Sequence, residues 1–67
     1  MNYVIRTNLG ILMVGVDGKY CFDDVGKVAL FMNYRSADNF AKKMREILPK
    51  KIRSYEILDV KRMKQDG

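Results

Sequence analysis

The apolar pattern of the first third of the chain predicts three β-strands. Residues 2–7 alternate β-favouring side chains between two faces, which is typical of a strand. Residues 11–16 are apolar on both faces, which predicts a central strand covered on both sides. The pair Asp17-Gly18 follows directly and favours a type I′ hairpin turn into a third strand over residues 19–22.

Residues 23–34 carry a pattern that fits either helix or strand. Asp23 or Asp24 can cap a short helical turn, whereas the run VALFMNY fits an extended strand equally well. We predict a brief helical turn near residues 24–29, followed by extended chain to Tyr34. The two aspartates could bind a divalent cation, but we favour a role as a turn or helix cap, which explains them without one.

A helix is predicted from Ser36, because apolar residues then recur at spacings of three and four. Ser36 is the expected N-cap, and Asp38 is placed in the first turn, where a negative charge suits the helix dipole. Asp38 and Lys42 form an i,i+4 pair in the favourable order. Pro49 ends the helix, because its ring disfavours helical geometry in the preceding residue. The apolar stripe consists of Ala37, Phe40, Ala41, Met44, Ile47 and Leu48.

The remaining elements complete an α+β fold. Residues 55–60 form a last strand, and residues 63–67 a frayed polar tail after a single domain over residues 1–62. We therefore expect a small antiparallel sheet of three N-terminal strands and one C-terminal strand. The amphipathic helix packs on one face, and the last strand pairs beside the first.

Size and composition limit the function classes. A chain of 67 residues, 48% hydrophobic and 31% charged, is typical of one small globular domain. A single cysteine, Cys21, cannot form an internal disulfide and fits a reducing cytoplasm. The N-terminus lacks a signal-peptide pattern, and the longest apolar run, ILMVGV, is far shorter than the roughly 20 residues that span a bilayer. We expect a soluble cytoplasmic protein with no membrane partner.

Residues that usually carry chemistry are scarce. The chain has no histidine, which removes the usual general base near neutral pH and the commonest metal ligand. The glycines form neither a GxxxxGK[ST] nor a GxGxxG phosphate loop. We predict no catalytic residue, no cofactor and no metal site, and hence a protein that is not an enzyme.

The positive charge is concentrated in residues 42–53. This segment holds six of the 13 basic residues and one of the 8 acidic residues. Because the basic and acidic residues outside it are equal in number, the segment carries the entire net charge of +5. Three interpretations stay open: a solvated helix face, a surface that neutralises nucleic-acid phosphates, and a docking surface for an acidic protein. The candidate partner- or phosphate-binding residues are Lys42, Lys43, Arg45, Lys50, Lys51 and Arg53.

Four stretches of the sequence carry a resemblance over nearly the whole chain: NYVIRTNLGILMVGVDGKYCF, KVALF, SADNFAKKMREI and YEILDV. Together they resemble a loose class of very small proteins encoded by phages and prophages of Gram-positive bacteria. The resemblance implies expression in an infected cytoplasm, where small binding proteins redirect or block host machinery, including defence nucleases.

We therefore expect a non-enzymatic accessory protein that binds a host protein or complex with an acidic surface. Direct binding of DNA or RNA by the same basic residues is the alternative. A homodimer stays open, since a small sheet with a free edge can pair with a second copy.

Overall fold

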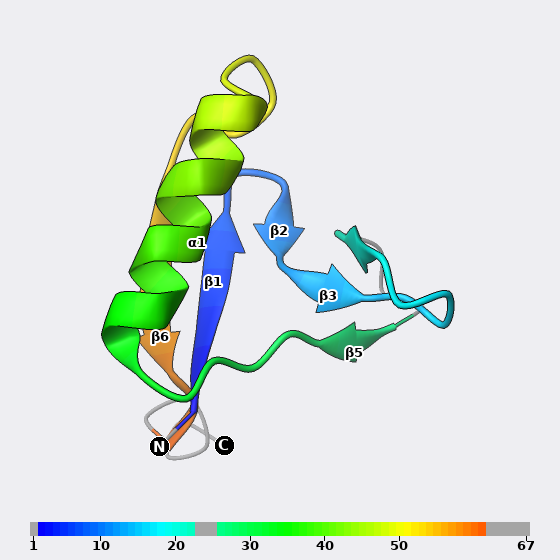
Figure 1. Cartoon of the computed structure of the whole chain (residues 1–67), viewed down its shortest axis with the longest axis vertical. Coiled ribbons are helices and arrows are strands. Elements are labelled where there is room, and N and C mark those ends of the chain that lie inside the picture. Colours follow the sequence, from blue (N-terminus) through cyan, green and yellow to red (C-terminus); the bar gives the residue numbers. More distant parts are fainter. Residues whose placement is uncertain (1, 23–25, 62–67) are drawn as a thin grey trace.

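The computed structural model describes residues 2–22 and 26–61, and its fold is α+β, as predicted (Figure 1). The strands form two three-stranded antiparallel sheets instead of one. The predicted tail over residues 63–67 and the cap at Asp23 or Asp24 lie outside the described residues. The elements are β1 (Tyr3–Thr7), β2 (Gly10–Ile11), β3 (Met13–Val14), β4 (Tyr20–Cys21), β5 (Lys27–Val28), α1 (Tyr34–Ile47) and β6 (Tyr55–Asp59).

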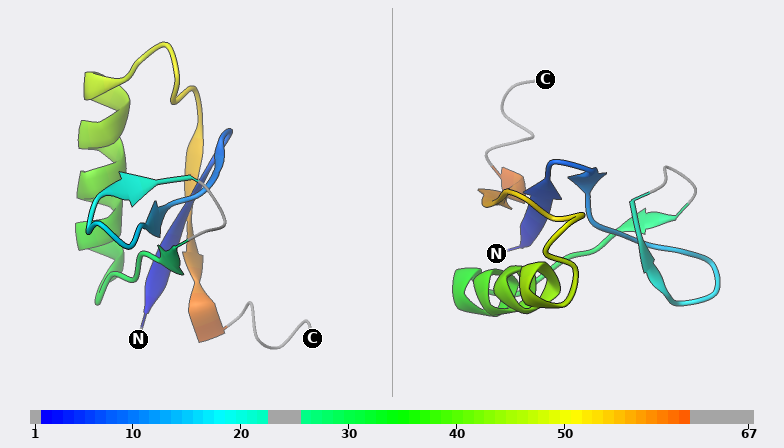
Figure 2. Two further views of the ribbon diagram at one scale, coloured as in Figure 1. Left: turned by 90° about the vertical axis from the view of Figure 1, so that its right-hand side faces the viewer. Right: turned by 90° about the horizontal axis from the view of Figure 1, so that it is seen from above.

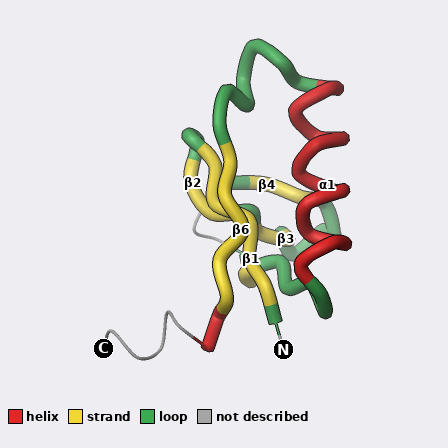
Figure 3. Tube along the Cα trace, turned by 90° about the vertical axis from the view of Figure 1, so that its left-hand side faces the viewer, coloured by secondary structure: helices red, strands yellow, loops and turns green. Residues whose placement is uncertain are grey.

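The first sheet, in the order β2-β1-β6, carries the helix. β6 pairs antiparallel with β1, with Ile5 opposite Ile57, which confirms that the last strand returns beside the first. α1 lies along one face of these strands (Figure 3). There the fully buried side chains of Ala37 and Ala41 form the core together with Ile5. Alanines at the centre of this face let the helix approach the sheet closely.

The segment predicted as one strand over residues 11–16 is divided between the two sheets at Leu12. The Leu12 N–H donates to the Ile5 carbonyl at 2.9 Å, whereas the Leu12 carbonyl accepts from the Ala29 N–H at 3.0 Å. The Leu12 side chain is fully buried. The second sheet, in the order β4-β3-β5, consequently projects from the side of the first (Figure 2).

The hairpin between β3 and β4 forms where Asp17-Gly18 predicted it, but its turn is not type I′. Gly18 has a φ of 81°, whereas Asp17 does not have a positive φ. The Gly18 N–H donates to the Gly15 carbonyl at 2.9 Å, and the Gly15 N–H donates to the Lys19 carbonyl at 2.8 Å. This is a three-residue loop whose last residue is left-handed, which is a common way to close a hairpin.

The chain after residue 25 is extended, so the predicted helical turn near residues 24–29 is wrong from Gly26 onward. β5 pairs with β3, and a Cβ atom at Gly26 would lie 2.1 Å from the Val14 carbonyl oxygen. Only glycine allows this close approach. Further along, Phe31 pairs with Tyr3 through backbone hydrogen bonds of 2.8 and 2.9 Å.

Helix α1 begins two residues before the predicted N-cap. Asn33 is the N-cap, and its Oδ1 accepts a hydrogen bond from the Ser36 N–H at 2.8 Å. The predicted place of Asp38 in the first turn is therefore wrong too. The C-cap is Leu48, immediately before Pro49, so the predicted stop is confirmed.

Candidate docking groove and basic surface

Two of the six predicted binding residues, Lys42 and Arg45, lie on the side of α1 that faces β6. Lys42 Nζ is 3.0 Å from Asp38 Oδ2, which confirms the predicted i,i+4 pair. The Tyr55 hydroxyl group donates to Asp38 Oδ1 at 3.1 Å, and the Arg45 guanidinium lies over the Tyr55 ring, 5.3 Å from its centroid. These two cations are therefore engaged in contacts that join the helix to the last strand.

The ionisation of this cluster reinforces its contacts. The hydrogen bond from Lys42 lowers the pKa of Asp38 below its usual 3.8, and the same bond raises the pKa of Lys42. Burial, and then the hydrogen bond to Asp38, raise the pKa of Tyr55 above 10.0. At neutral pH the carboxylate is ionised, the ammonium is protonated and the phenol keeps its donor proton. Lys42 is then paired with a carboxylate of its own helix.

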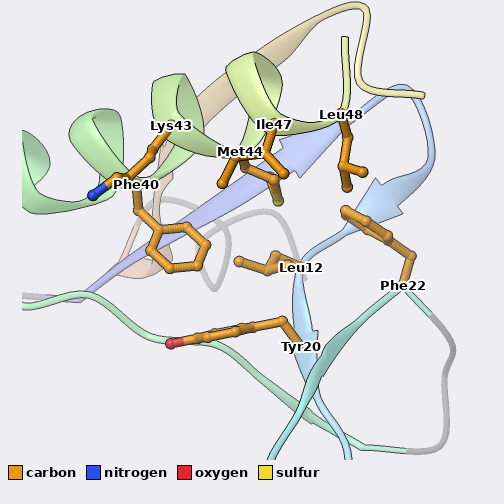
Figure 4. A pocket seen from close by; sticks show the side chains of 8 residues that line it. All are labelled: Leu12, Tyr20, Phe22, Phe40, Lys43, Met44, Ile47 and Leu48. Atoms are coloured by element: carbon orange, nitrogen blue, oxygen red, sulfur yellow. The ribbon is translucent and has the colours of Figure 1, made fainter. Parts of the chain in front are cut away.

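Lys43 lies on the opposite side of the helix from Arg45. Residues two positions apart in an α-helix project about 200° from each other, nearly in opposite directions. The Lys43 side chain lies beside Phe40 and forms part of an apolar groove (Figure 4). Helical geometry thus places it about 100° around the helix from Lys42 and on the opposite side from Arg45.

The other three basic residues, Lys50, Lys51 and Arg53, are exposed on the loop between α1 and β6. The loop is anchored through Asn8, whose Nδ2 donates to the Lys51 carbonyl and whose Oδ1 accepts from the Arg53 N–H, both at 2.8 Å. Ile52 between them is fully buried. The backbone is therefore held while the basic side chains extend into solvent.

The groove lies between α1 and β4 and has a volume of about 270 Å³. The ring centroids of Tyr20 and Phe40 are 4.8 Å apart across it, and Phe40 in turn packs against Phe31 at 5.3 Å. Figure 4 shows the side chains of the helix and the hairpin converging on the same space. The lining residues are Leu12, Tyr20, Phe22, Phe40, Lys43, Met44, Ile47 and Leu48.

Sequence reasoning did not predict this groove. It placed Ile47 and Leu48 in the buried stripe of the helix, but their side chains are 69% and 38% exposed. Tyr20, on the opposite wall, is 54% exposed. The stripe of α1 is longer than the first sheet can cover, and the second sheet stands off from the C-terminal end of the helix instead of closing over it. Among the residues that the structure describes, Lys43 is the only charged one that lines the groove.

A second row of exposed apolar side chains follows the extended segment before α1. Val28, Leu30 and Met32 occupy alternate positions and are exposed, whereas Ala29 and Phe31 between them pack into the core. Leu30 therefore points away from the core and serves as a matched control for substitutions in the groove.

Within residues 2–22 and 26–61, no group of three or more Cys, Asp or Glu side chains is placed to hold a metal ion. No helix in the same residues is long and apolar enough to cross a membrane. The chain matches no family model, no curated protein and no solved structure.

Proposed function

We propose that the protein works by binding another protein, with the groove between α1 and β4 as the central contact. In this proposal it is a phage-type accessory protein without catalytic activity, present in the cytoplasm of a Gram-positive host, where it modulates a host protein or complex. The observation that supports this is the exposed apolar groove with Lys43 at its wall.

The physical argument concerns the cost of exposing apolar side chains. Ile47, Leu48 and Tyr20 keep much of their apolar surface in water, although they line the same groove as the fully buried Leu12. Contiguous apolar surface of this kind marks interaction sites, because its burial by a partner is favourable at about 25 cal/mol per Å². Aromatic side chains in a pocket are also common anchors of protein interfaces.

The basic loop supplies the second part of the proposed interface. Lys50, Lys51 and Arg53 are exposed, and the described residues give none of them an ion-pair partner. The Lys51 N–H donates to the carbonyl of Leu48, which places the loop next to one end of the groove. Unpaired charges beside an apolar site accelerate and orient the approach of an acidic partner.

The test is co-purification from nuclease-treated lysate of a Gram-positive host, with three proteins compared side by side. The wild-type protein and Leu30→Gln should recover the same stoichiometric partner, whereas Ile47→Gln should lose it. Ile47 and Leu30 are similarly exposed, so the two variants remove comparable apolar surface from different places. Equal recovery by Ile47→Gln would show that the groove is not the contact.

Nucleic-acid binding remains the second candidate, supported by the three exposed bases of the loop. Direct binding of phosphates predicts an affinity for arbitrary duplex or single-stranded nucleic acid that falls steeply with salt concentration. Replacing Lys50 by Gln should reduce the slope of log affinity against log salt by about 1. Absence of binding at low salt rules this candidate out.

A further inference from the structure

The wall of the groove formed by β4 is also the free edge of the second sheet. In the order β4-β3-β5, β3 is the only strand of the described residues that pairs with β4. In an antiparallel pair, the backbone groups of successive residues point alternately toward and away from the partner strand. The hydrogen bond from the Gly15 N–H to the Lys19 carbonyl shows that Lys19, and therefore Cys21, points its backbone groups toward β3. The backbone N–H and C=O groups of Tyr20 and Phe22 point away from β3, and within the described residues these groups make no hydrogen bond.

The same two residues, Tyr20 and Phe22, place their side chains in the groove. A strand added beside β4 would continue the pleat, so every second side chain would lie on the face that looks toward α1. On that side Leu48 extends from the helix toward Phe22, and Phe40 lies over Tyr20 (Figure 4). One extended segment can therefore satisfy the backbone groups of the edge and fill the groove at once.

The size and charge of the groove indicate what such a segment carries. About 270 Å³ is below the roughly 300–1,000 Å³ of typical small-molecule sites, which favours side chains over a cofactor. Within the described part of the chain, Lys43 is the one charged lining residue, and Lys50 and Lys51 lie on the adjoining loop. A carboxylate flanking the inserted side chain would find the Lys43 ammonium at the wall of the groove. A second copy of this chain would bring a net charge of +5 against +5.

We propose that the partner adds an extended acidic segment to β4 as a fourth strand, with an apolar side chain in the groove and a carboxylate beside Lys43. This rests on the proposed function and specifies the mode of binding and the chemistry of the partner. Strand addition takes its affinity from backbone hydrogen bonds and its specificity from the pockets that receive alternate side chains.

The experiment selects peptides from a random display library on the immobilised wild-type protein and measures the affinity of the enriched peptides. Peptides that alternate apolar and acidic residues are expected. N-methylation of one peptide N–H that faces β4 should weaken binding about tenfold, because it removes a backbone hydrogen bond and adds bulk. N-methylation of the neighbouring N–H, which faces solvent, should change the affinity little.

Variants of the protein test the charge. Lys43→Glu should weaken binding of the acidic peptides about fivefold or more, with a reduced salt dependence. Arg35→Glu is the matched control, because it changes the net charge equally at the other end of α1, and it should bind as the wild type does. Enrichment of basic peptides, or equal effects of both variants, would overturn the acidic assignment.

The outcomes separate this inference from the proposed function. If Ile47→Gln abolishes peptide binding but both N-methylated peptides bind equally, the groove is a docking site and strand addition is wrong. If Ile47→Gln also leaves peptide binding unchanged, the proposed function itself loses its support. A concentration-dependent dimer that the peptides dissociate would assign the groove to a second copy instead.

Discussion

The Tyr55 hydroxyl group donates a hydrogen bond to Asp38 Oδ1 at 3.1 Å and thereby ties β6 to α1. Lys42 pairs with the other carboxylate oxygen, and Arg45 stacks on the ring of the same tyrosine. Two residues that sequence analysis assigned to a partner therefore have a structural role at the junction of helix and sheet. The exposed bases of the loop and Lys43 are better placed for binding.

Acid should destabilise the protein partly through Asp38. Its folded-state pKa is lowered, so its contribution to stability is present above its usual pKa of 3.8 and is lost as the pH falls through the lowered value. In Asp38→Asn this part of the acid sensitivity should be absent. Urea unfolding midpoints from roughly pH 2 to 6 measure it. An unchanged pH dependence in the variant would contradict the assignment.

Alkaline pH should weaken the same contact by deprotonating the Tyr55 hydroxyl group. The folded-state pKa of Tyr55 is raised, so its contribution is complete below 10.0 and is lost as the pH rises through the raised value. Tyr55→Phe should remove part of the alkaline destabilisation. In an ultraviolet titration, the variant should also lack one phenolate step with a midpoint above 10.0. If the phenolate step that the variant lacks has its midpoint at or below 10.0, the prediction is wrong.

The N-cap can be tested by two alanine substitutions three residues apart. Asn33→Ala removes the side-chain acceptor of the Ser36 N–H and should cost about 0.5–2 kcal/mol in free energy of unfolding. Ser36→Ala should cost less, because the structure assigns no capping bond to its hydroxyl group. Chemical denaturation measures the free energy of unfolding of both variants. A larger loss for Ser36→Ala than for Asn33→Ala would show that Ser36 is the N-cap, as the sequence predicted.

Leu12 should be one of the most sensitive positions for stability. Its side chain is fully buried where the chain passes from the first sheet to the second, so Leu12→Ala should cost about 2–5 kcal/mol. That loss is large for a domain of this size. Val16→Ala is the control, since Val16 is 98% exposed and the change should stay within about 0.5 kcal/mol. Thermal unfolding gives both values.

The basic loop should lose its order when its anchor is removed. Asn8→Ala eliminates the side-chain bonds to the Lys51 carbonyl and the Arg53 N–H, so the Arg53 amide should exchange its hydrogen faster. Asn39→Ala, on the exposed surface of α1, should leave that exchange unchanged. Hydrogen exchange followed by NMR compares them. Equal protection in both variants would mean that Asn8 does not hold the loop.

Much of the local structure was determined by the sequence alone. The three- and four-residue spacing produces α1, Pro49 ends it, and Asp17-Gly18 closes the hairpin. These signals are local, because each depends on backbone preferences or on side chains within one turn. The pairing of β6 beside β1 was also predicted, since a last strand beside the first closes the fold around one helix.

Tertiary contacts decided the rest. Leu12 divides an apolar run between two sheets because its two backbone groups bond to Ile5 and Ala29, residues far apart in the chain. The close approach of Gly26 to Val14 selects strand over helix in a segment that local pattern left open.

The candidate site follows the same division. The sequence determined how many bases lie in residues 42–53, but the helical angle, the bond between Asp38 and Tyr55 and the anchor at Asn8 separate them into three groups. The groove exists because the second sheet stands off from the end of α1 and leaves Ile47 and Leu48 exposed. Apolar periodicity shows which residues share a face, whereas the tertiary structure decides whether another element covers that face.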